Sequence, residues 1–283
     1  MDKGKDQSME KMKRSERVAA ITRALSCEPG RLFTLREFVE WFGCAKSTLS
    51  EDITTVRTVL AKYGLGVVES VNGAAGGVRF YPFNEDAADA AFIVSLCSEM
   101  SAKERILAGG FLYTVDLFSN PRLLTRMGEI FAKKFCRQQP DVVVTVESMG
   151  VPISLMVAKA LGKPMVTARR DNRISEGSVV TLNYMSASSK RVQTMSMPRR
   201  SLISGQKALI IDDFMKGGGT AKALESMMQE FGVQVCGTGV IVATQEPRAK
   251  RVQEYYPLMI LGTVDEEAGF ADIRPADWLS VKS

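Results

Sequence analysis

Two adjacent carboxylates followed by a glycine-rich loop carry the clearest chemical signal in the sequence. Asp212 and Asp213 come directly after the apolar run 208–211, which predicts a buried parallel strand that ends at the acids. Three glycines at 217–219 follow, and Thr220 opens a helical stretch. Open α/β sheets bind ligands at the carboxyl ends of their strands, and glycine amides beside a helix N-terminus favour an anion. The stretch therefore predicts a phosphate cradle beside two acceptors for sugar hydroxyls, which together would hold a phosphorylated ribose.

These residues resemble the phosphoribosyl pyrophosphate (PRPP) motif of type I phosphoribosyltransferases. That motif consists of four apolar residues, the pair Asp212 and Asp213, and a short loop that ends in Gly-Gly-Thr220. The resemblance implies that the paired acids bind the ribose 2′- and 3′-hydroxyls and that the loop binds the 5′-phosphate. The Walker A pattern requires Gly-x4-Gly-Lys-Ser/Thr, and no segment of the sequence fits it. The alternative interpretation of the glycines is a flexible turn between a strand and a helix.

A second loop precedes this motif along the chain. The β-branched run 142–146 predicts a buried strand, the loop Glu147-Ser-Met-Gly150 follows it, and Pro152 suits the first turn of the next helix. In phosphoribosyltransferases the equivalent loop binds the pyrophosphate of PRPP. Taken alone, the four residues are equally typical of an ordinary turn.

The segment 169–200 between the two loops is long and rich in cations. Runs 179–184 and 192–197 could pair as a hairpin within it, and the phosphoribosyltransferase family has a hood or flap loop in this position. A long polar insertion at the ligand edge of an α/β sheet is usually functional. The cations could meet pyrophosphate, contact DNA or face solvent, and we favour phosphate contact for some of them without assigning which. They are Arg169, Arg170, Arg173, Lys190, Arg191, Arg199 and Arg200.

The composition excludes several classes of protein. The 283 residues are 45% apolar and 24% charged, as in ordinary globular domains, and they include no histidine, so Ser-His-Asp and Cys-His mechanisms are excluded. Five scattered cysteines suggest neither a zinc site nor a disulfide framework. The net charge of +5 permits nucleic-acid binding without arguing for it. The charged N-terminus and the lack of a long apolar run predict a cytoplasmic protein without a membrane segment.

The N-terminal part has the periodicity of a DNA-binding domain. Apolar spacing predicts helices over 15–25, 35–42 and 46–63, then strands over 66–71 and 77–81. Three helices followed by a hairpin are typical of a winged helix, whose third helix enters the major groove while the wing contacts the backbone or minor groove. The polar residues expected to face DNA are Lys46, Ser47, Thr48, Ser50 and Arg57 on the helix, with Gly73, Gly76, Gly77 and Arg79 on the wing. A helical dimerisation or docking domain remains the alternative.

Over nearly its whole length the chain resembles the bacterial purine operon repressor family. The resemblance lies in the stretches 45–52, 73–78, 104–110, 171–178, 191–196 and 212–220. It implies a homodimeric repressor that binds DNA upstream of purine biosynthesis genes. It also implies that the phosphoribosyltransferase fold lacks catalytic activity. PRPP, bound together with Mg²⁺, would weaken repression. Guanosine tetraphosphate would occupy the same pocket and favour DNA binding. No further cofactor is expected.

The sequence predicts a domain architecture and a set of effector-binding residues. We expect an α/β protein with a winged helix-turn-helix domain over 1–81 and a type I phosphoribosyltransferase domain, with a Rossmann-like parallel sheet, over 82–283. Phe111, Tyr113 or Phe214 could stack on a guanine, although aromatic residues at such positions more often belong to the core, and Lys216 suits a ligand with additional phosphate. The full set expected to bind the effector is Asp212, Asp213, Phe214, Met215, Lys216, Gly217, Gly218, Gly219, Thr220, Glu147, Ser148, Met149, Gly150, Phe111 and Tyr113. No catalytic residue and no metal ligand is expected. The alternative function is an active purine phosphoribosyltransferase with an appended DNA-binding domain.

Overall fold

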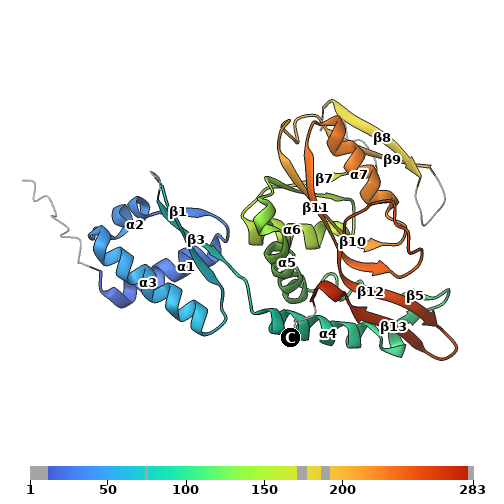
Figure 1. Cartoon of the computed structure of the whole chain (residues 1–283), viewed down its shortest axis with the longest axis horizontal. Helices are drawn as coiled ribbons and strands as arrows, with labels where there is room; N and C mark the ends of the chain where they lie inside the picture. Colours follow the sequence, from blue (N-terminus) through green and yellow to red (C-terminus); the bar gives the residue numbers. More distant parts are fainter. Residues whose placement is uncertain (1–11, 74–75, 171–176, 186–191, 280–283) are drawn as a thin grey trace, which may run out of the picture. The chain divides into compact units, whose positions relative to one another are not determined.

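The computed structural model describes residues 12–73, 76–170, 177–185 and 192–279. The chain divides into two compact units, Met1–Phe83 and Asn84–Ser283, and each is described by itself. The division falls just past the expected boundary at 81/82, because the last strand of the first unit ends at Tyr81 and a short extended stretch follows. Figure 1 labels the elements of both units.

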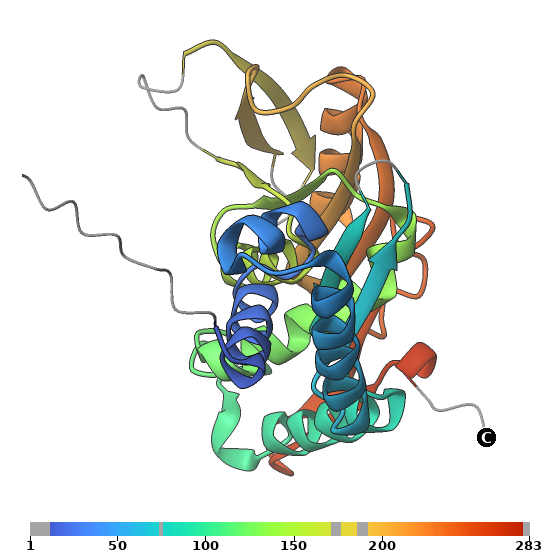
Figure 2. The same ribbon diagram turned by 90° about the vertical axis from the view of Figure 1, so that its left-hand side faces the viewer.

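The N-terminal unit consists of three helices and a small antiparallel sheet. The helices are α1 (Arg14–Cys27), α2 (Leu35–Phe42) and α3 (Lys46–Lys62), and the strands are β1 (Leu32–Thr34), β2 (Val67–Val71) and β3 (Gly77–Tyr81), in the order β1-β3-β2. The sequence predicts all of these elements except β1, which is too short to show a periodic pattern. The hairpin β2–β3 lies beside α3 (Figure 2).

One core holds these elements together. Phe33 of β1, Phe38 of α2 and Leu49 of α3 are fully buried within it. A buried ion pair joins α1 to α3, with Arg17 Nε 2.7 Å from Asp52 Oδ2. Removing one partner would leave an uncompensated buried charge, so the pair fixes α3 against α1. The polar face of α3 is thereby presented on a rigid support.

The C-terminal unit is built on a six-stranded sheet. Its strands, in the order β13-β12-β11-β10-β6-β7, are β13 (Phe270–Pro275), β12 (Tyr256–Asp265), β11 (Gln234–Thr244), β10 (Lys207–Met215), β6 (Val142–Val146) and β7 (Met165–Ala168). All neighbours pair in parallel except β12 and β13. The sequence predicts the parallel strands but not the antiparallel edge strand β13. The carboxyl ends of the parallel strands share one edge of the sheet, where ligands of such folds bind.

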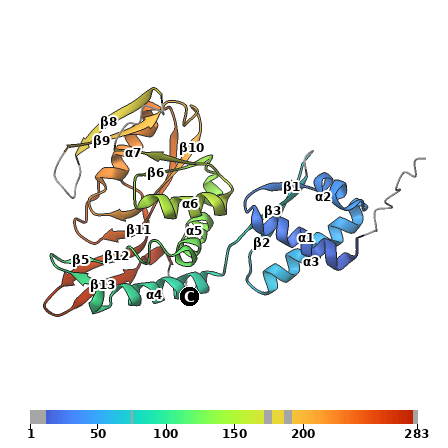
Figure 3. The same cartoon turned by 180° about the vertical axis from the view of Figure 1, so that it is seen from behind.

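Helices cover both faces of this sheet (Figures 1 and 3). They are α4 (Asp86–Met100), α5 (Pro121–Phe135), α6 (Gly150–Leu161) and α7 (Gly219–Glu230). Alternate side chains of β10 point to opposite faces: Leu209 lies near Phe135 of α5, whereas Ile210 packs in the cluster that includes Leu224 of α7. This arrangement holds β10 centrally and fixes where its carboxyl end emerges.

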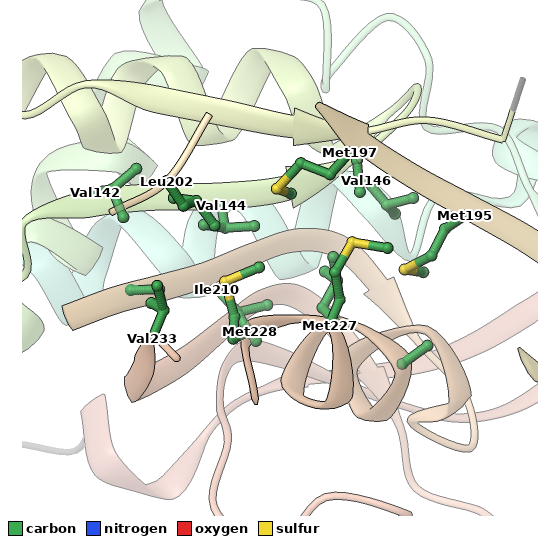
Figure 4. Packing of buried hydrophobic residues seen from close by; sticks show 14 of the residues in the cluster. Val142, Val144, Val146, Met195, Met197, Leu202, Ile210, Met227, Met228 and Val233 are labelled. Atoms are coloured by element: carbon green, nitrogen blue, oxygen red, sulfur yellow. The ribbon is translucent and has the colours of Figure 1, made fainter. Parts of the chain in front are cut away.

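The predicted hairpin within 169–200 is present. Strands β8 (Val179–Met185) and β9 (Val192–Pro198) pair antiparallel along their whole length. Met195 and Met197 of β9 are fully buried beside Met227 of α7 and Val146 of β6 (Figure 4). The hairpin extends from the sheet as a packed element (Figure 1). The cations Arg173, Lys190 and Arg191, together with positions 171–176 of the family motif, lie outside the described residues.

The connection between α4 and α5 corrects one expectation. The Ser-x-x-Glu pattern at 101–104 predicts the start of a helix, but Ser101 instead caps the end of α4, and only a short 3-10 turn, η1 (Lys103–Arg105), follows. The strands β4 (Ile106–Leu107) and β5 (Phe111–Leu112) then pair as a hairpin. Gly109 and Gly110 both have positive φ, which a continuing helix does not tolerate. No helix among the described residues has the length and apolar character needed to span a membrane.

Candidate functional site

The paired carboxylates lie within β10 rather than after it. The strand continues to Met215, beyond the predicted end at 211, so Asp212 and Asp213 belong to its last part. Asp212 is only 6% exposed, and its Oδ1 accepts a hydrogen bond from the backbone N–H of Asp213 at 3.0 Å. Burial, reinforced by the charge of Asp213, raises the pKa of Asp212 well above its ordinary value, while the positive charge of Arg170 acts in the opposite direction. Asp213 is half-buried, next to Asp212 in the last part of the strand.

The two predicted loops meet at this position. β6 pairs with β10, so the loop 147–150 emerges beside the acids. A Cβ on Gly150 would lie 2.5 Å from Thr145 Oγ1 and 2.6 Å from Asp212 Oδ1, which shows how closely the start of α6 approaches β10. Ser154 of α6 donates a buried hydrogen bond to the carbonyl of Ile211 at 3.1 Å. The expected pyrophosphate loop and the expected ribose acceptors are therefore adjacent, with Ser148 exposed and Glu147 and Met149 half-buried.

The glycine loop leads directly into α7. Gly218 has φ 74° and is the N-cap residue, and α7 begins at Gly219, one residue before the predicted start. The three glycines are buried, Thr220 is half-buried, and Lys216 is exposed. The first amides of a helix lack intrahelical partners and carry partial positive charge. The loop thus offers the backbone donors that an anion requires.

Sequence reasoning missed the segment that supports this loop. Residues 250–252, in the segment that follows β11, pack against the side of the loop at Gly218, where a Cβ would lie 3.2 Å from Arg251 N. Lys250 Nζ donates to the carbonyl of Lys216 at 2.6 Å, and Arg251 N donates to the carbonyl of Gly217 at 3.0 Å. The sequence of this polar segment contains no motif or periodic pattern that distinguishes these residues from those of an ordinary turn.

The expected aromatic residues do not form one cluster. Phe214 is exposed at the end of β10, close to the acids. Phe111, which is 69% exposed, and Tyr113 belong to the β4–β5 hairpin, which approaches the turn between β12 and β13: Gly110 lies near Glu266, and Gly269 lies against Lys103. The hairpin is therefore near the carboxyl end of β12, with β11 between that strand and β10.

Met215 differs from the other residues of the expected effector set. Its side chain is 3% exposed and packs with Ala221 and Val252 in an apolar cluster. The Met215 side chain therefore has a packing role, and any contact of this residue with a ligand would come from its backbone.

The start of α3 presents exposed polar groups. Lys46 and Ser47 are exposed, Thr48 is half-buried, and Ser50 is exposed with its hydroxyl donating to the carbonyl of Lys46 at 3.0 Å. Leu49, between them, points into the core. A helix N-terminus with lysine and hydroxyl side chains suits contact with phosphates and base edges.

Three of the remaining residues expected to face DNA, Arg57, Gly77 and Arg79, take part in contacts within the unit itself. Arg57 donates to the carbonyl of Val68 at 3.0 Å and to Ser70 Oγ at 2.6 Å, so it ties α3 to β2. Gly77 is buried against the backbone of Phe33. Arg79 is half-buried and lies 3.4 Å from the Tyr81 hydroxyl, whereas Gly73 is exposed and Gly76 is half-buried at the wing.

Each of the two units matches a known protein family. The family model described as "Bacterial purine repressor, N-terminal" matches residues 13–82, and the model described as "Phosphoribosyl transferase domain" matches residues 115–270. The purine biosynthesis transcriptional repressor PurR of Bacillus subtilis (strain 168) is 38% identical over 269 residues, which cover 95% of this chain and 94% of that protein. The purine biosynthesis transcriptional activator PurR of Lactococcus lactis subsp. lactis (strain IL1403) is 35% identical over 254 residues, which cover 90% and 94%.

The fold of the C-terminal unit also matches solved structures. The crystal structure of adenine phosphoribosyltransferase from Thermoanaerobacter pseudethanolicus aligns with a TM-score of 0.51 at 17% identity, covering 59% of this chain and 98% of that one. These matches define a DNA-binding transcription regulator that carries a phosphoribosyltransferase-type domain. The chain belongs to the PurR family of purine biosynthesis transcriptional regulators.

Proposed function

We propose that the chain represses purine biosynthesis genes and that PRPP, bound at the Asp212 site, weakens its hold on DNA. One observation carries this proposal: Gly150 abuts the Asp212 carboxylate, so the loop 147–150 and the glycine loop that continues from β10 both lie next to the paired acids. A ribose that bears phosphate at one end and pyrophosphate at the other matches that arrangement.

Each part of PRPP has a suitable partner in the site. The exposed edge of Asp213 and the carboxylate of Asp212 would accept hydrogen bonds from the ribose hydroxyls. The amides of the loop 217–219, at the N-terminus of α7, would bind the 5′-phosphate. The loop 147–150 would bind the pyrophosphate, and Arg170, whose charge already acts on Asp212, adds a cation nearby.

We propose further that the domain senses PRPP without transferring its ribose. Both PurR relatives described above are named as regulators, and no histidine is present to act as a general acid or base. An active purine phosphoribosyltransferase is the alternative, supported by the match to that domain over residues 115–270. Incubation with PRPP, Mg²⁺ and each purine base distinguishes the two, because nucleotide formation at an enzyme's ordinary rate would contradict a purely sensory role.

Guanosine tetraphosphate is proposed as a second ligand of the same pocket that favours DNA binding. Phe214 is exposed beside the acids, where it could stack on a guanine, and the exposed Lys216 adds a charge for further phosphates. Phe111 and Tyr113 are exposed on the β4–β5 hairpin and could contribute only from the β12 side of the edge. If the two ligands share the pocket, PRPP must displace a labelled guanosine tetraphosphate competitively; simultaneous binding would contradict this.

Regulation of this kind requires a difference in affinity between two states. To weaken DNA binding tenfold, PRPP must bind the DNA-free protein about tenfold more tightly than the DNA-bound protein, which corresponds to about 1.4 kcal/mol. We propose that the protein acts as a homodimer, since helix-turn-helix proteins commonly bind two half-sites as dimers. Light scattering of the free protein tests this, and a monomer at working concentration would contradict it.

The direct experiment measures fluorescence anisotropy of labelled DNA from upstream of purine genes. PRPP is expected to raise the Kd for this DNA in the wild type and to leave it unchanged in the double variant Asp212→Ala, Asp213→Ala, which should still bind DNA. Transcription from the same DNA in vitro then gives the sign of regulation, because one relative is named a repressor and the other an activator.

A further inference from the structure

The carbonyl groups of the phosphate loop are held from one side. Lys216 O accepts from Lys250 Nζ at 2.6 Å, and Gly217 O accepts from Arg251 N at 3.0 Å. The Thr244 hydroxyl lies 3.4 Å from Lys216 O but donates its proton to Glu246 O at 2.6 Å. Both donors to the loop belong to the segment that follows β11. The segment therefore forms a back wall to the loop.

Holding a carbonyl also orients the amide that shares its peptide plane. In a planar trans peptide the C=O of one residue and the N–H of the next point in opposite directions. The cis peptides of the described residues are at 147–148 and 246–247, so the planes 216–217 and 217–218 are trans. With their carbonyls directed at the back wall, the N–H groups of Gly217 and Gly218 face the opposite side of the loop.

The ammonium group of Lys250 is suited to this task. Besides Lys216 O, it donates to Thr244 O at 2.7 Å and lies 3.3 Å from Thr244 Oγ1, so its three protons have uncharged oxygen partners. None of the ion pairs among the described residues involves Lys250, and its side chain is half-buried. Burial lowers the pKa of the Lys250 ammonium, while the negative charge of Glu246 acts in the opposite direction. The ammonium charge lies directly behind the loop.

We propose that Lys250 is a positioning residue for phosphate binding: it fixes the loop with its amides facing the ligand and supplies positive charge behind them. The inference rests on the proposed function in taking the 5′-phosphate of a phosphorylated ribose as the anion. Lys250 itself does not touch the ligand, because its protons are directed at Lys216 and Thr244.

The test compares Lys250→Met and Lys250→Arg in the full chain, with Lys163→Met as the control. Lys163 is exposed after α6, so its replacement makes the same change in net charge away from the loop. Calorimetric titration with ribose 5-phosphate is expected to show a Kd about tenfold higher for Lys250→Met, as for the loss of a charge-assisted contact. Lys250→Arg, which keeps the charge and can donate to the same carbonyl, should recover most of the affinity. The Kd for pyrophosphate, which would bind the other loop, should not change.

A second readout needs no ligand. In protein labelled with 15N-glycine, the 23 glycines give a small set of amide signals, and those of Gly217 and Gly218 should shift in Lys250→Met but not in Lys163→Met. If Lys250→Met does not fold, Lys250→Arg and Thr244→Val are measured in the same two ways, with a smaller loss expected for each.

The outcomes separate the inference from the proposed function. Unchanged ribose 5-phosphate affinity or unmoved Gly217 and Gly218 signals in Lys250→Met would overturn the role of Lys250 and leave the regulator intact. If the wild type binds ribose 5-phosphate as described but PRPP does not change its Kd for DNA, the proposed function is overturned and the role of Lys250 is retained. A wild type that does not bind ribose 5-phosphate would overturn both.

Discussion

Replacing Asp212 by Asn is expected to stabilise the protein while weakening its response to PRPP. The carboxylate is almost fully buried beside Asp213, and burial raises its pKa well above the ordinary value. An Asn at this position retains an oxygen to accept the Asp213 N–H and gains a donor for the Asp213 carboxylate. The substitution therefore removes a buried charge without leaving the backbone donor unpaired.

The size of the gain follows from the pKa of Asp212. Each unit by which folding raises the pKa of an acid costs about 1.4 kcal/mol at pH values above the raised pKa. In a unit the size of Asn84–Ser283, each kcal/mol moves the melting temperature by about 2–4 °C. Above the raised pKa the folded protein holds a buried charge that the unfolded chain exposes to water, so Asp212→Asn should raise Tm most at pH 8. As the pH falls through the folded-state pKa toward the ordinary value of 3.8, Asp212 becomes neutral and the gain should disappear.

The assay is thermal unfolding at pH 8 and pH 5 for the wild type and Asp212→Asn. Asp141→Asn is the matched control, because Asp141 is exposed yet also accepts a backbone N–H, from Lys207 at 2.9 Å. Binding of PRPP by Asp212→Asn should weaken by roughly 10- to 100-fold, the value of one hydrogen bond to a charged acceptor. A lower Tm for Asp212→Asn than for the wild type at pH 8, or a Tm gain that grows toward pH 5, would show that the buried charge of Asp212 does not destabilise the protein.

Three further substitutions test the structural basis of the two sites. Gly150→Ala places a Cβ 2.6 Å from Asp212 Oδ1, so it should destabilise the C-terminal unit by about 1–3 kcal/mol, seen in urea unfolding, and weaken PRPP binding measured by calorimetry. Gly77→Ala places a Cβ 2.1 Å from the carbonyl of Phe33 and should separate β1 from β3, so circular dichroism should show earlier melting of the N-terminal unit, at a cost of at least about 1–3 kcal/mol. Lys46→Ala should weaken binding to specific and unrelated DNA alike and reduce the slope of log Kd against log salt by about 1; an unchanged slope would remove Lys46 from the phosphate contacts.

Much of the fold is encoded locally. Apolar periodicity and glycine stops predict α1, α2 and α3, and the β-branched run 142–146 coincides with β6. The sequence pattern does not predict β1 and β13, because a short strand is specified by its partners rather than by its own pattern. The false helix start at Ser101 has a similar cause: a capping pattern predicts a helix only if the following residues can continue it, and Gly109 and Gly110 cannot.

The sequence predicts those residues of the candidate site that form a recognisable motif. It does not predict those whose role depends on packing between distant segments. The acids and glycines are recognisable from their order, and their closeness to the loop 147–150 follows from parallel strands. The burial of Met215, the use of Arg57 in tying α3 to β2, and the support of the loop by Lys250 are tertiary contacts between segments far apart in sequence. No local pattern distinguishes an arginine that contacts its own backbone from one that contacts DNA.

The central claim is that PRPP and DNA oppose each other's binding, and linkage makes this testable from the PRPP side. Calorimetric titration of PRPP into the free protein, and into the protein saturated with DNA from upstream of purine genes, gives two values of Kd. We expect weaker PRPP binding in the DNA complex, by the same factor by which PRPP weakens DNA binding, since coupling is reciprocal. Equal PRPP affinity in the two titrations would contradict it.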